Sequence, residues 1–270
     1  MRRLGPGLLV GIAVAASVLA TAASAADLPA PAGPAYYPPV YRPVIYDWTG
    51  IYGGVNFGAG LLEDQVTTTT TTALQPAGVA TKLSPFAVVG GAQAGFNYQI
   101  QQFVIGAEGT FTWSDISGTQ ATPSQPPVSL PTFSETSIST PRWYATATGK
   151  FGFAANDFLF YAKAGAAWMS VNYTQAASTG TGNVSSQTIS DTRSGFTAGG
   201  GIEFGMTENL SARLEYDYLN FGTKTYTFAN LNTAPAALVL PVAIRSSTSL
   251  ITIGLNYRFN WGGGGAVVTR

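Results

Sequence analysis

The lengths of the connections between predicted strands constrain the fold of this chain most strongly. About eight stretches of roughly 10–14 residues alternate apolar and polar side chains, and the gaps between them run long, short, long, short, long, short, long. This alternation is typical of an up-and-down barrel in an outer membrane, with brief periplasmic turns and larger outer loops. The predicted fold class is therefore all-β, an eight-stranded antiparallel up-and-down transmembrane β-barrel.

The expected strands and connections follow from this periodicity. The strands are predicted over residues 48–60, 86–99, 103–113, 142–154, 158–172, 194–206, 210–221 and 247–259. Short turns are expected at residues 99–102, 156–157 and 207–209, and long loops at residues 61–85, 115–139, 173–193 and 222–246. Successive side chains of a strand point to opposite faces, so each strand has one apolar and one polar parity.

Charge separates cleanly between the two parities. The apolar parity is nearly free of charge, and a shift of one residue in register would turn the charged set into lipid. An Arg or Lys at the bilayer midplane costs about 2–4 kcal/mol in such barrels. We therefore expect nine side chains to form a charge network in the lumen: Glu108, Arg142, Lys150, Lys163, Glu203, Arg213, Glu215, Asp217 and Arg258.

Aromatic side chains of the apolar parity gather near the strand ends, as expected for interfacial girdles. The predicted girdle toward the long loops is Phe57, Trp113, Trp143, Trp168 and Phe196, and the predicted girdle toward the short turns is Tyr98, Phe103, Phe153, Phe158, Phe204 and Tyr257. A soluble β-sandwich or lipocalin-like barrel would have the inverse parity, and its dry core would not tolerate unpaired charges.

Composition argues against most enzyme classes. The chain has 270 residues, no Cys and no His, so it lacks thiolate chemistry and the commonest general base and metal ligand. Lys+Arg and Asp+Glu both number 13, so no charge excess indicates nucleic acid. Glu215 and Asp217 share a strand face with Arg213, which fits an ion-pair network better than catalytic carboxylates. We expect no enzyme activity, no cofactor and no metal site.

The segments outside the barrel have their own signatures. Residues 1–25 predict a signal peptide, with Arg2 and Arg3 before an apolar run and Ala23-Ser24-Ala25 at the cleavage position. A retained anchor is the alternative, but the run is shorter than the ~20 residues that a spanning helix prefers. Residues 26–46 are a Pro/Tyr-rich periplasmic segment, either a linker or a contact for peptidoglycan. The barrel covers residues 47–261, and residues 262–270 form a Gly-rich tail.

Several segments carry a family resemblance that spans essentially the whole mature chain. They are DWTGIYGGVNFGAG, GGAQAGFNYQ, FVIGAEGTF, GGGIEFGMTENLSARLEYDYLNFG and the closing LITIGLNYRF. The chain resembles the small outer-membrane β-barrel (porin-family) proteins of alphaproteobacteria, relatives of the OmpA-like eight-stranded barrels. The resemblance implies a Gram-negative outer membrane, with its lipids and lipopolysaccharide as surroundings. It also implies that Tyr257 and Phe259 are read by the barrel-assembly machinery, although a tail follows Phe259 here.

Three functions remain open from the sequence. The first is a structural, envelope-stabilising barrel, because an eight-stranded lumen is just wide enough for side chains to fill it and buried charges must pair. The second is a small porin or low-conductance channel, which inward Tyr52, Tyr144 and Tyr161 would narrow. The third is a surface adhesion or interaction protein that uses its outer loops. Lumen width, which the sequence does not give, discriminates the first two.

Overall fold

The computed structural model describes residues 46–70, 77–114, 118–123, 134–178, 184–233 and 236–259. The predicted signal peptide, residues 26–45 and the Gly-rich tail lie outside these ranges. No helix in the described ranges is long and apolar enough to cross a membrane. The strands are β1 (Gly50–Thr68), β2 (Ala80–Leu83), β3 (Phe86–Ile100), β4 (Phe103–Ser114), β5 (Gly118–Pro123), β6 (Ser134–Ala155), β7 (Phe158–Ser178), β8 (Val184–Gly205), β9 (Leu210–Thr233) and β10 (Ala236–Phe259).

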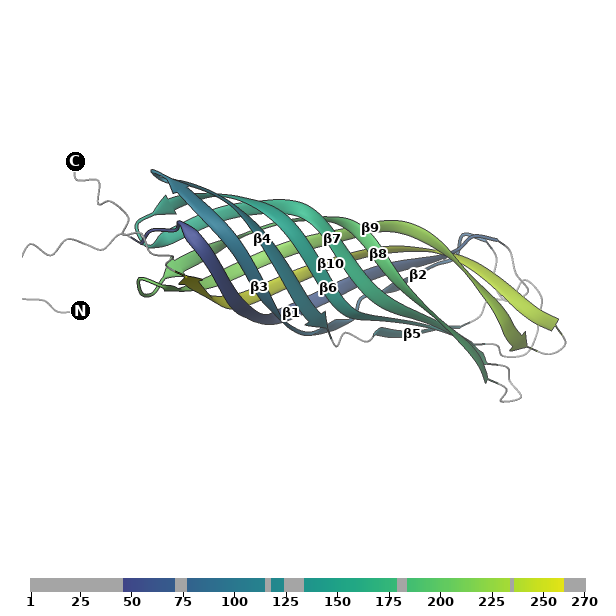
Figure 1. The fold of residues 1–270 in the computed structure, drawn as a ribbon. Helices are drawn as coiled ribbons and strands as arrows, with labels where there is room; N and C mark the ends of the chain where they lie inside the picture. The colour runs from purple at the N-terminus through teal and green to yellow at the C-terminus, as the bar shows by residue number, and fades with distance from the viewer. Residues whose placement is uncertain are drawn as a thin grey trace, which may run out of the picture. The chain divides into compact units, whose positions relative to one another are not determined.

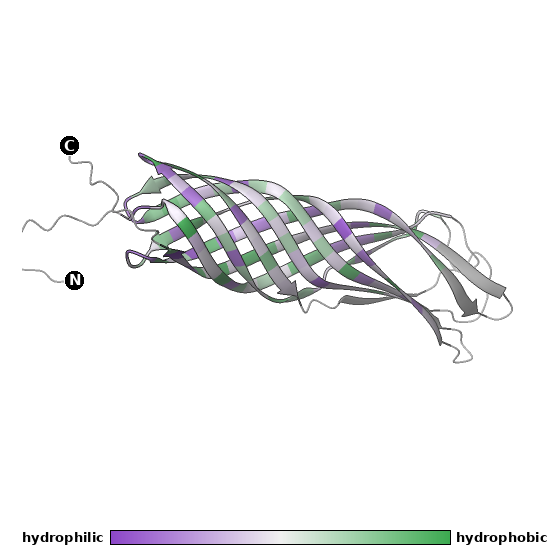
Figure 2. Cartoon of the chain, in the orientation of Figure 1, coloured by the Kyte–Doolittle hydropathy of each residue, from purple (hydrophilic) through white to green (hydrophobic). Residues whose placement is uncertain are grey.

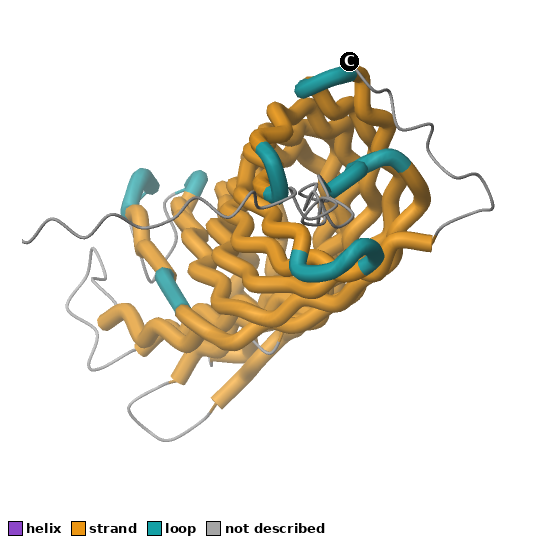
Figure 3. The backbone as a smooth tube through the Cα atoms, turned by 90° about the vertical axis from the view of Figure 1, so that its left-hand side faces the viewer, coloured by secondary structure: helices purple, strands orange, loops and turns teal. Residues whose placement is uncertain are grey.

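Eight of these strands close into an antiparallel barrel in the order β10-β9-β8-β7-β6-β4-β3-β1. Pairing of β1 with β10 completes the ring, in a register that runs from Ile51 opposite Phe259 to Thr68 opposite Val242. The two remaining strands are short: β2 pairs with β1, and β5 pairs with β6. Figure 1 shows the tilted strands, and Figure 3 shows them around a common axis with the short turns nearest the viewer. The predicted fold class is confirmed.

The three short turns lie where the sequence predicts them, at what we call the short-turn end. Gln101 and Asn156 have left-handed backbone, with φ of 57° and 54°, which lets each connection reverse the chain in two residues. The third turn, between β8 and β9, is held by hydrogen bonds from Met206 N and Thr207 N to Leu210 O, at 2.8 and 3.1 Å. Strand boundaries at this end therefore agree closely with the sequence.

The opposite, long-hairpin end differs from the sequence prediction. Residues expected as long loops are mostly strand, because β1 continues to Thr68, β7 continues to Ser178 and β9 continues to Thr233. The prediction was wrong here because it relied on apolar residues of one constant parity. Above the expected strand ends the apolar residues change to the other parity, so the outward pattern stops while the backbone ladder continues.

The change of parity is clear along β7. Up to Trp168 the outward residues are apolar, such as exposed Ala164, while inward Lys163 is buried and charged. Beyond Trp168 the inward residues Met169 and Val171 are buried and apolar. The hydropathy colours in Figure 2 follow the same alternation along the strands. Apolar side chains thus cover the outside of the barrel from the short-turn end up to Trp168. Beyond Trp168, toward the long-hairpin end, they fill its inside.

At the long-hairpin end the wall separates into two hairpins. β8 pairs with β9 only from Phe196 opposite Asn220 to Gly205 opposite Ser211, whereas both strands continue well beyond Phe196 and Asn220. β8 goes on pairing with β7, and β9 goes on pairing with β10. Figure 1 shows these two hairpins diverging toward their tips. Between them lies a seam, β8 residues 184–195 facing β9 residues 221–233, that has no backbone ladder.

Candidate functional site in the barrel lumen

Glu108 on β4 is the centre of the polar lumen. Its Oε2 lies 2.7 Å from Arg213 Nη1 and 3.3 Å from Lys150 Nζ, and its Oε1 lies 3.2 Å from Lys163 Nζ. The Tyr52 hydroxyl donates a further hydrogen bond of 2.7 Å to Oε2. These partners come from β1, β6, β7 and β9. One carboxylate therefore connects strands around most of the barrel, and its side chain is completely inaccessible to solvent.

A second group of acids completes the arrangement. Lys163 Nζ lies 2.8 Å from Glu215 Oε1 and 3.0 Å from Asp217 Oδ2. Arg213 Nη2 lies 3.3 Å from the same Glu215 oxygen, and the Tyr161 hydroxyl donates to Glu215 Oε2 at 2.6 Å. Each cation therefore contacts at least two carboxylates, which is the arrangement that desolvated charges require.

Glu203 extends the network toward the short-turn end. It lies 3.9 Å from Lys150 Nζ, and its Oε1 accepts hydrogen bonds from Ser211 Oγ at 2.5 Å and from Asn256 Nδ2 at 2.7 Å. Lys150 also lies over the ring of Tyr161, with 4.3 Å from Nζ to the centroid. We call the following seven residues the ion-pair layer: Glu108, Lys150, Lys163, Glu203, Arg213, Glu215 and Asp217.

Two glycines make room for the tyrosines beside this layer. Tyr52 is paired with Gly95 on β3, and Tyr161 is paired with Gly201 on β8. A Cβ at Gly95 would lie 2.5 Å from the Tyr52 hydroxyl oxygen, and a Cβ at Gly201 would lie 2.7 Å from that of Tyr161. Each ring lies flat across the neighbouring strand only because that position has no side chain. The phenols thus reach Glu108 and Glu215 and occupy lumen volume.

Two of the nine predicted lumen charges are not part of the ion-pair layer. Arg142 is exposed and not in the lumen, because β6 carries a register irregularity between Pro141 and Trp143 that removes it from the inward parity. Arg258 is buried at the short-turn end, where its guanidinium donates to the backbone carbonyls of Asp47, Thr49 and Glu208. The other seven form the ion-pair layer. The sequence prediction for Arg142 was wrong because a bulge is invisible to strict alternation.

An apolar core fills the barrel above the ion-pair layer, toward the long-hairpin end. We call it the apolar cap; its buried residues are Leu62, Val66, Leu83, Val89, Tyr144, Ala167, Met169, Val171, Tyr173, Leu219, Phe221, Tyr226, Phe228, Val242, Ile244 and Leu250. They come from both sides of the seam. Apolar packing across the lumen therefore holds the two hairpins together where the backbone ladder has ended.

Side chains also bridge the seam directly. Buried Arg193 on β8 donates to the carbonyls of Phe221 and Gly222 on β9, at 3.1 and 2.8 Å, and to Tyr173 OH and Ser246 Oγ, at 3.0 and 2.9 Å. Two residues before Arg193 on the same face of β8, part-buried Asp191 accepts from Lys224 Nζ at 2.7 Å and from the Tyr226 hydroxyl at 2.5 Å. Sequence reasoning missed Arg193 and Asp191 because both lie where a loop was expected. The change of the apolar residues to the other parity was the sequence signal that the strands continue through these positions.

Residues that precede the first strand close the short-turn end. Tyr46 and Trp48, which we call the stopper, are 6% and 2% exposed and pack ring against ring at 4.4 Å. Trp48 N donates to Gln99 Oε1 at 2.9 Å, and the Arg258 guanidinium lies 4.9 Å from the Tyr46 ring centroid. Gly205 is required beside them, since a Cβ there would lie 2.3 Å from a Tyr46 ring carbon. Trp48 was expected on the first strand, which instead begins at Gly50.

The predicted girdle residues all lie on the outer wall. Ten of the eleven are at least 38% exposed, and the eleventh, Trp143, is partly exposed and stacks on Phe111 with ring centroids 5.5 Å apart. Phe259, the predicted assembly residue, is also exposed and packs edge-on against Tyr257 at 5.3 Å. Between the two aromatic rows the outer wall is apolar, while the lumen behind it is polar.

These features together define an outer-membrane β-barrel protein. The antiparallel barrel is closed, its outer band is apolar with aromatic rows at both edges, and its lumen is polar. The chain belongs to the outer membrane protein beta-barrel domain family, whose model matches residues 12–259. It is 28% identical to the 31 kDa outer-membrane immunogenic protein of Brucella melitensis over 92% of this chain and 98% of that protein. It is 27% identical to the 25 kDa outer-membrane immunogenic protein of Brucella abortus over 82% and 86% of the two chains.

The chain also aligns with solved structures of outer-membrane and attachment proteins. The outer membrane protein OprG of Pseudomonas aeruginosa aligns over 79% of this chain and 99% of its own, with a TM-score of 0.49 and 11% identity. Ail of Yersinia pestis aligns over 77% and 99%, with a TM-score of 0.32 and 14% identity. The protein is located in the outer membrane of a Gram-negative bacterium. In such barrels the short-turn end faces the periplasm and the long-hairpin end faces the outside.

Proposed function

We propose that this protein is a structural barrel of the envelope whose lumen is closed. The observation that carries the proposal is the ion-pair layer, in which three cations and four carboxylates of the described residues cross the lumen between five strands. The side chains of Glu108, Lys150, Lys163, Arg213 and Glu215 are all 0–1% accessible. A lumen that conducts ions must expose its lining charges to water.

Two further layers support the proposal. The apolar cap excludes water above the ion-pair layer, and the stopper covers the lumen beneath it. A solute would have to cross all three layers, and each is built from buried side chains. The same contacts that obstruct the lumen also tie strands together that are far apart in sequence, as Glu108 and Arg213 are. Closure and rigidity of the barrel therefore have one physical cause.

Liposome swelling tests the closed lumen. Folded protein is inserted into vesicles loaded with an impermeant polymer and then exposed to small sugars or amino acids, with a known porin as positive control. We expect no swelling above protein-free vesicles. Swelling at a rate that scales with the amount of folded protein would overturn the proposal and favour a small porin.

An envelope role needs a cellular test. We expect that deletion of the gene sensitises cells to detergents and bile salts, and that the wild-type chain restores resistance. A chain with Glu108→Ala, expressed at the same level in the outer membrane, should restore it only in part, because the barrel is weakened. Equal resistance with and without the gene would remove the structural role.

A surface-interaction function is a second candidate. The observation that favours it is the extension of β7–β8 and β9–β10 well beyond the outer aromatic row, with outward Ser and Thr such as Ser170 and Thr174. The two Brucella relatives are named as immunogenic proteins, which fits exposed surface on those proteins. Shortening the β9–β10 hairpin without changing any cell-attachment phenotype would count against this candidate.

A further inference from the structure

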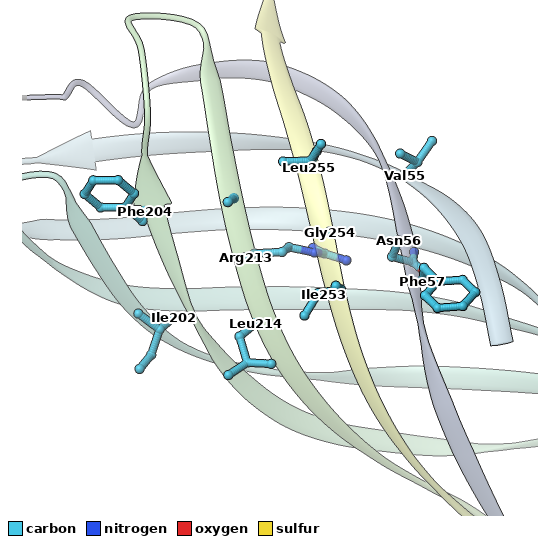
Figure 4. Close-up of a pocket in the computed structure, with 11 residues that line it drawn as sticks. Val55, Asn56, Phe57, Ile202, Phe204, Arg213, Leu214, Ile253, Gly254 and Leu255 are labelled. Atoms are coloured by element: carbon cyan, nitrogen blue, oxygen red, sulfur yellow. The ribbon is translucent and has the colours of Figure 1, made fainter. Parts of the chain in front are cut away.

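The lipid-facing wall carries an apolar groove on the side of the barrel formed by β8, β9, β10 and β1. It encloses about 690 Å³ and is lined by Val55, Phe57, Ile202, Phe204, Leu214 and Leu255, among others. Figure 4 shows these side chains pointing away from the strands, with Arg213 running behind Gly254 toward the lumen. Almost all of the lining is hydrocarbon, although the charged lumen lies directly behind it.

Strand register explains why the wall is hollow at this point. One row of outward residues across the four strands is Val55, Leu255, Ala212 and Phe204, and the next row is Phe57, Ile253, Leu214 and Ile202. Seven of these eight side chains are large, and Ala212 is the exception. The methyl group of Ala212 therefore forms the floor of a notch between Phe204 and Leu255. The notch continues between the two rows toward β1.

The position of the notch gives its depth in the membrane. Ala212 lies two residues after the start of β9, and Phe204 lies one residue before the end of β8. Both are at the short-turn end, so the notch itself lies in the periplasmic half of the apolar band. From there the groove rises toward Phe57, which belongs to the girdle toward the long loops. The leaflet on the periplasmic side of an outer membrane consists of phospholipid, so an acyl chain that enters the groove at the notch comes from a phospholipid.

We propose that this groove is a binding site for one acyl chain of a periplasmic-leaflet phospholipid. Lipid tails are as apolar as the leucine side chains around the notch, so the site gains nothing from hydrophobic transfer. Its advantage is contact, since a chain in the notch has protein atoms on three sides and each close atom pair contributes about 0.1–0.2 kcal/mol. A single flexible chain can follow a sloping groove that the bulky surface of a second barrel would not fill.

The chemistry of the groove also predicts its selectivity. Among the described residues at this end, the buried cation is Arg258, whose terminal nitrogens donate to backbone carbonyls of Asp47, Thr49 and Glu208. Its remaining donor, Nε, has no partner but is buried, so Arg258 offers no accessible donor to a phosphate. Retention should therefore depend on the acyl chain and not on the head group. Phosphatidylethanolamine and phosphatidylglycerol of equal chain length should bind alike, and short-chain phospholipids should bind more weakly than long-chain ones.

Native mass spectrometry of protein extracted from membranes tests the site. The variant Ala212→Phe fills the notch, and Ala164→Phe on β7 is the matched control, since Ala164 is also exposed on the lipid-facing wall between the aromatic rows. Heat-modifiable gel mobility checks that each variant is folded. If Ala212→Phe does not fold, Ala212→Leu replaces it. The measured quantity is the fraction of monomer that keeps one phospholipid through successive detergent washes.

We expect the wild type and Ala164→Phe to retain one phospholipid, and the filled-notch variant to retain at least several-fold less. Equal retention by all three proteins would show only nonspecific annular lipid and would overturn the proposal. A clear preference for one head group would also contradict it, as would a wild-type dimer that Ala212→Phe dissociates, since a second copy would then occupy the groove. None of these outcomes depends on whether the lumen conducts.

Discussion

Replacing Glu108 by Gln tests the ion-pair layer at its centre. The amide keeps the size of the side chain but removes the charge that Arg213, Lys150 and Lys163 share at 2.7, 3.3 and 3.2 Å. Lys163 and Arg213 keep Glu215 as an ion-pair partner, whereas the remaining carboxylate partner of Lys150 is Glu203 at 3.9 Å. Removal of one member of a buried ion pair costs about 3–5 kcal/mol. Because these side chains are fully inaccessible, solvent screening does not reduce that value.

The assay is urea unfolding of the barrel in lipid vesicles, followed by the loss of the fast-migrating folded band on unheated gels. Glu63→Gln is the control, since Glu63 is exposed on the outer wall and should change stability by less than about 0.5 kcal/mol. The double variant Glu108→Gln with Lys150→Met removes a cation together with the anion. It should lose less than the sum of the two single changes, by about 0.5–3 kcal/mol. Wild-type stability for Glu108→Gln, or strict additivity in the double variant, would refute the network.

Three further predictions concern other parts of the barrel. Ala147→Arg places a charge in lipid and should cost about 2–4 kcal/mol of folding free energy. Thr174→Arg, which lies beyond the outer aromatic row, should leave the folding free energy nearly unchanged. Equal costs for the two variants would refute the assignment of the membrane-facing band. Asp64 lies outside the membrane band, and burial raises the pKa of its carboxyl group. Ser139, Ser246 and Arg193 lower that pKa, but by less than burial raises it. An acid with a raised pKa stabilises the fold most while it is protonated, so Asp64→Asn should stabilise the barrel at neutral pH. The stability gained over the wild type should shrink as pH falls toward about 4, where the wild-type carboxyl group is protonated as well. A stability difference that does not change with pH would contradict this. Arg193→Gln should loosen the seam and speed amide exchange in residues 184–195, and unchanged exchange there would show that the apolar cap alone holds the hairpins.

The membrane-spanning part of the fold was predictable because lipid imposes a strict rule on every strand. A charged residue such as Lys163 must face inward and an apolar residue such as Phe160 must face outward, so alternation alone fixes strand, register and face. The short turns were predictable from Asn156-Asp157 and its counterparts. The ion-pair layer followed from the same rule, since nearly every charge removed from lipid has to enter the lumen.

The remaining parts escaped prediction for identifiable physical reasons. Above the outer aromatic row the surroundings change from lipid to water, and the apolar parity inverts, so Met169 and Val171 no longer match the pattern of the strand below. A bulge moved Arg142 out of the lumen because it shifts the parity of one strand locally. The stopper was not visible because Tyr46 and Trp48 act through contacts with residues far away in sequence, and no periodicity marks such contacts.

Single-channel recording of the folded mature chain in a planar bilayer tests the closed lumen most directly. We predict no stable conductance steps from protein whose folded state and insertion are shown by heat-modifiable mobility. Reproducible ohmic steps from the wild-type barrel would contradict the account and identify the ion-pair layer as the lining of a pore.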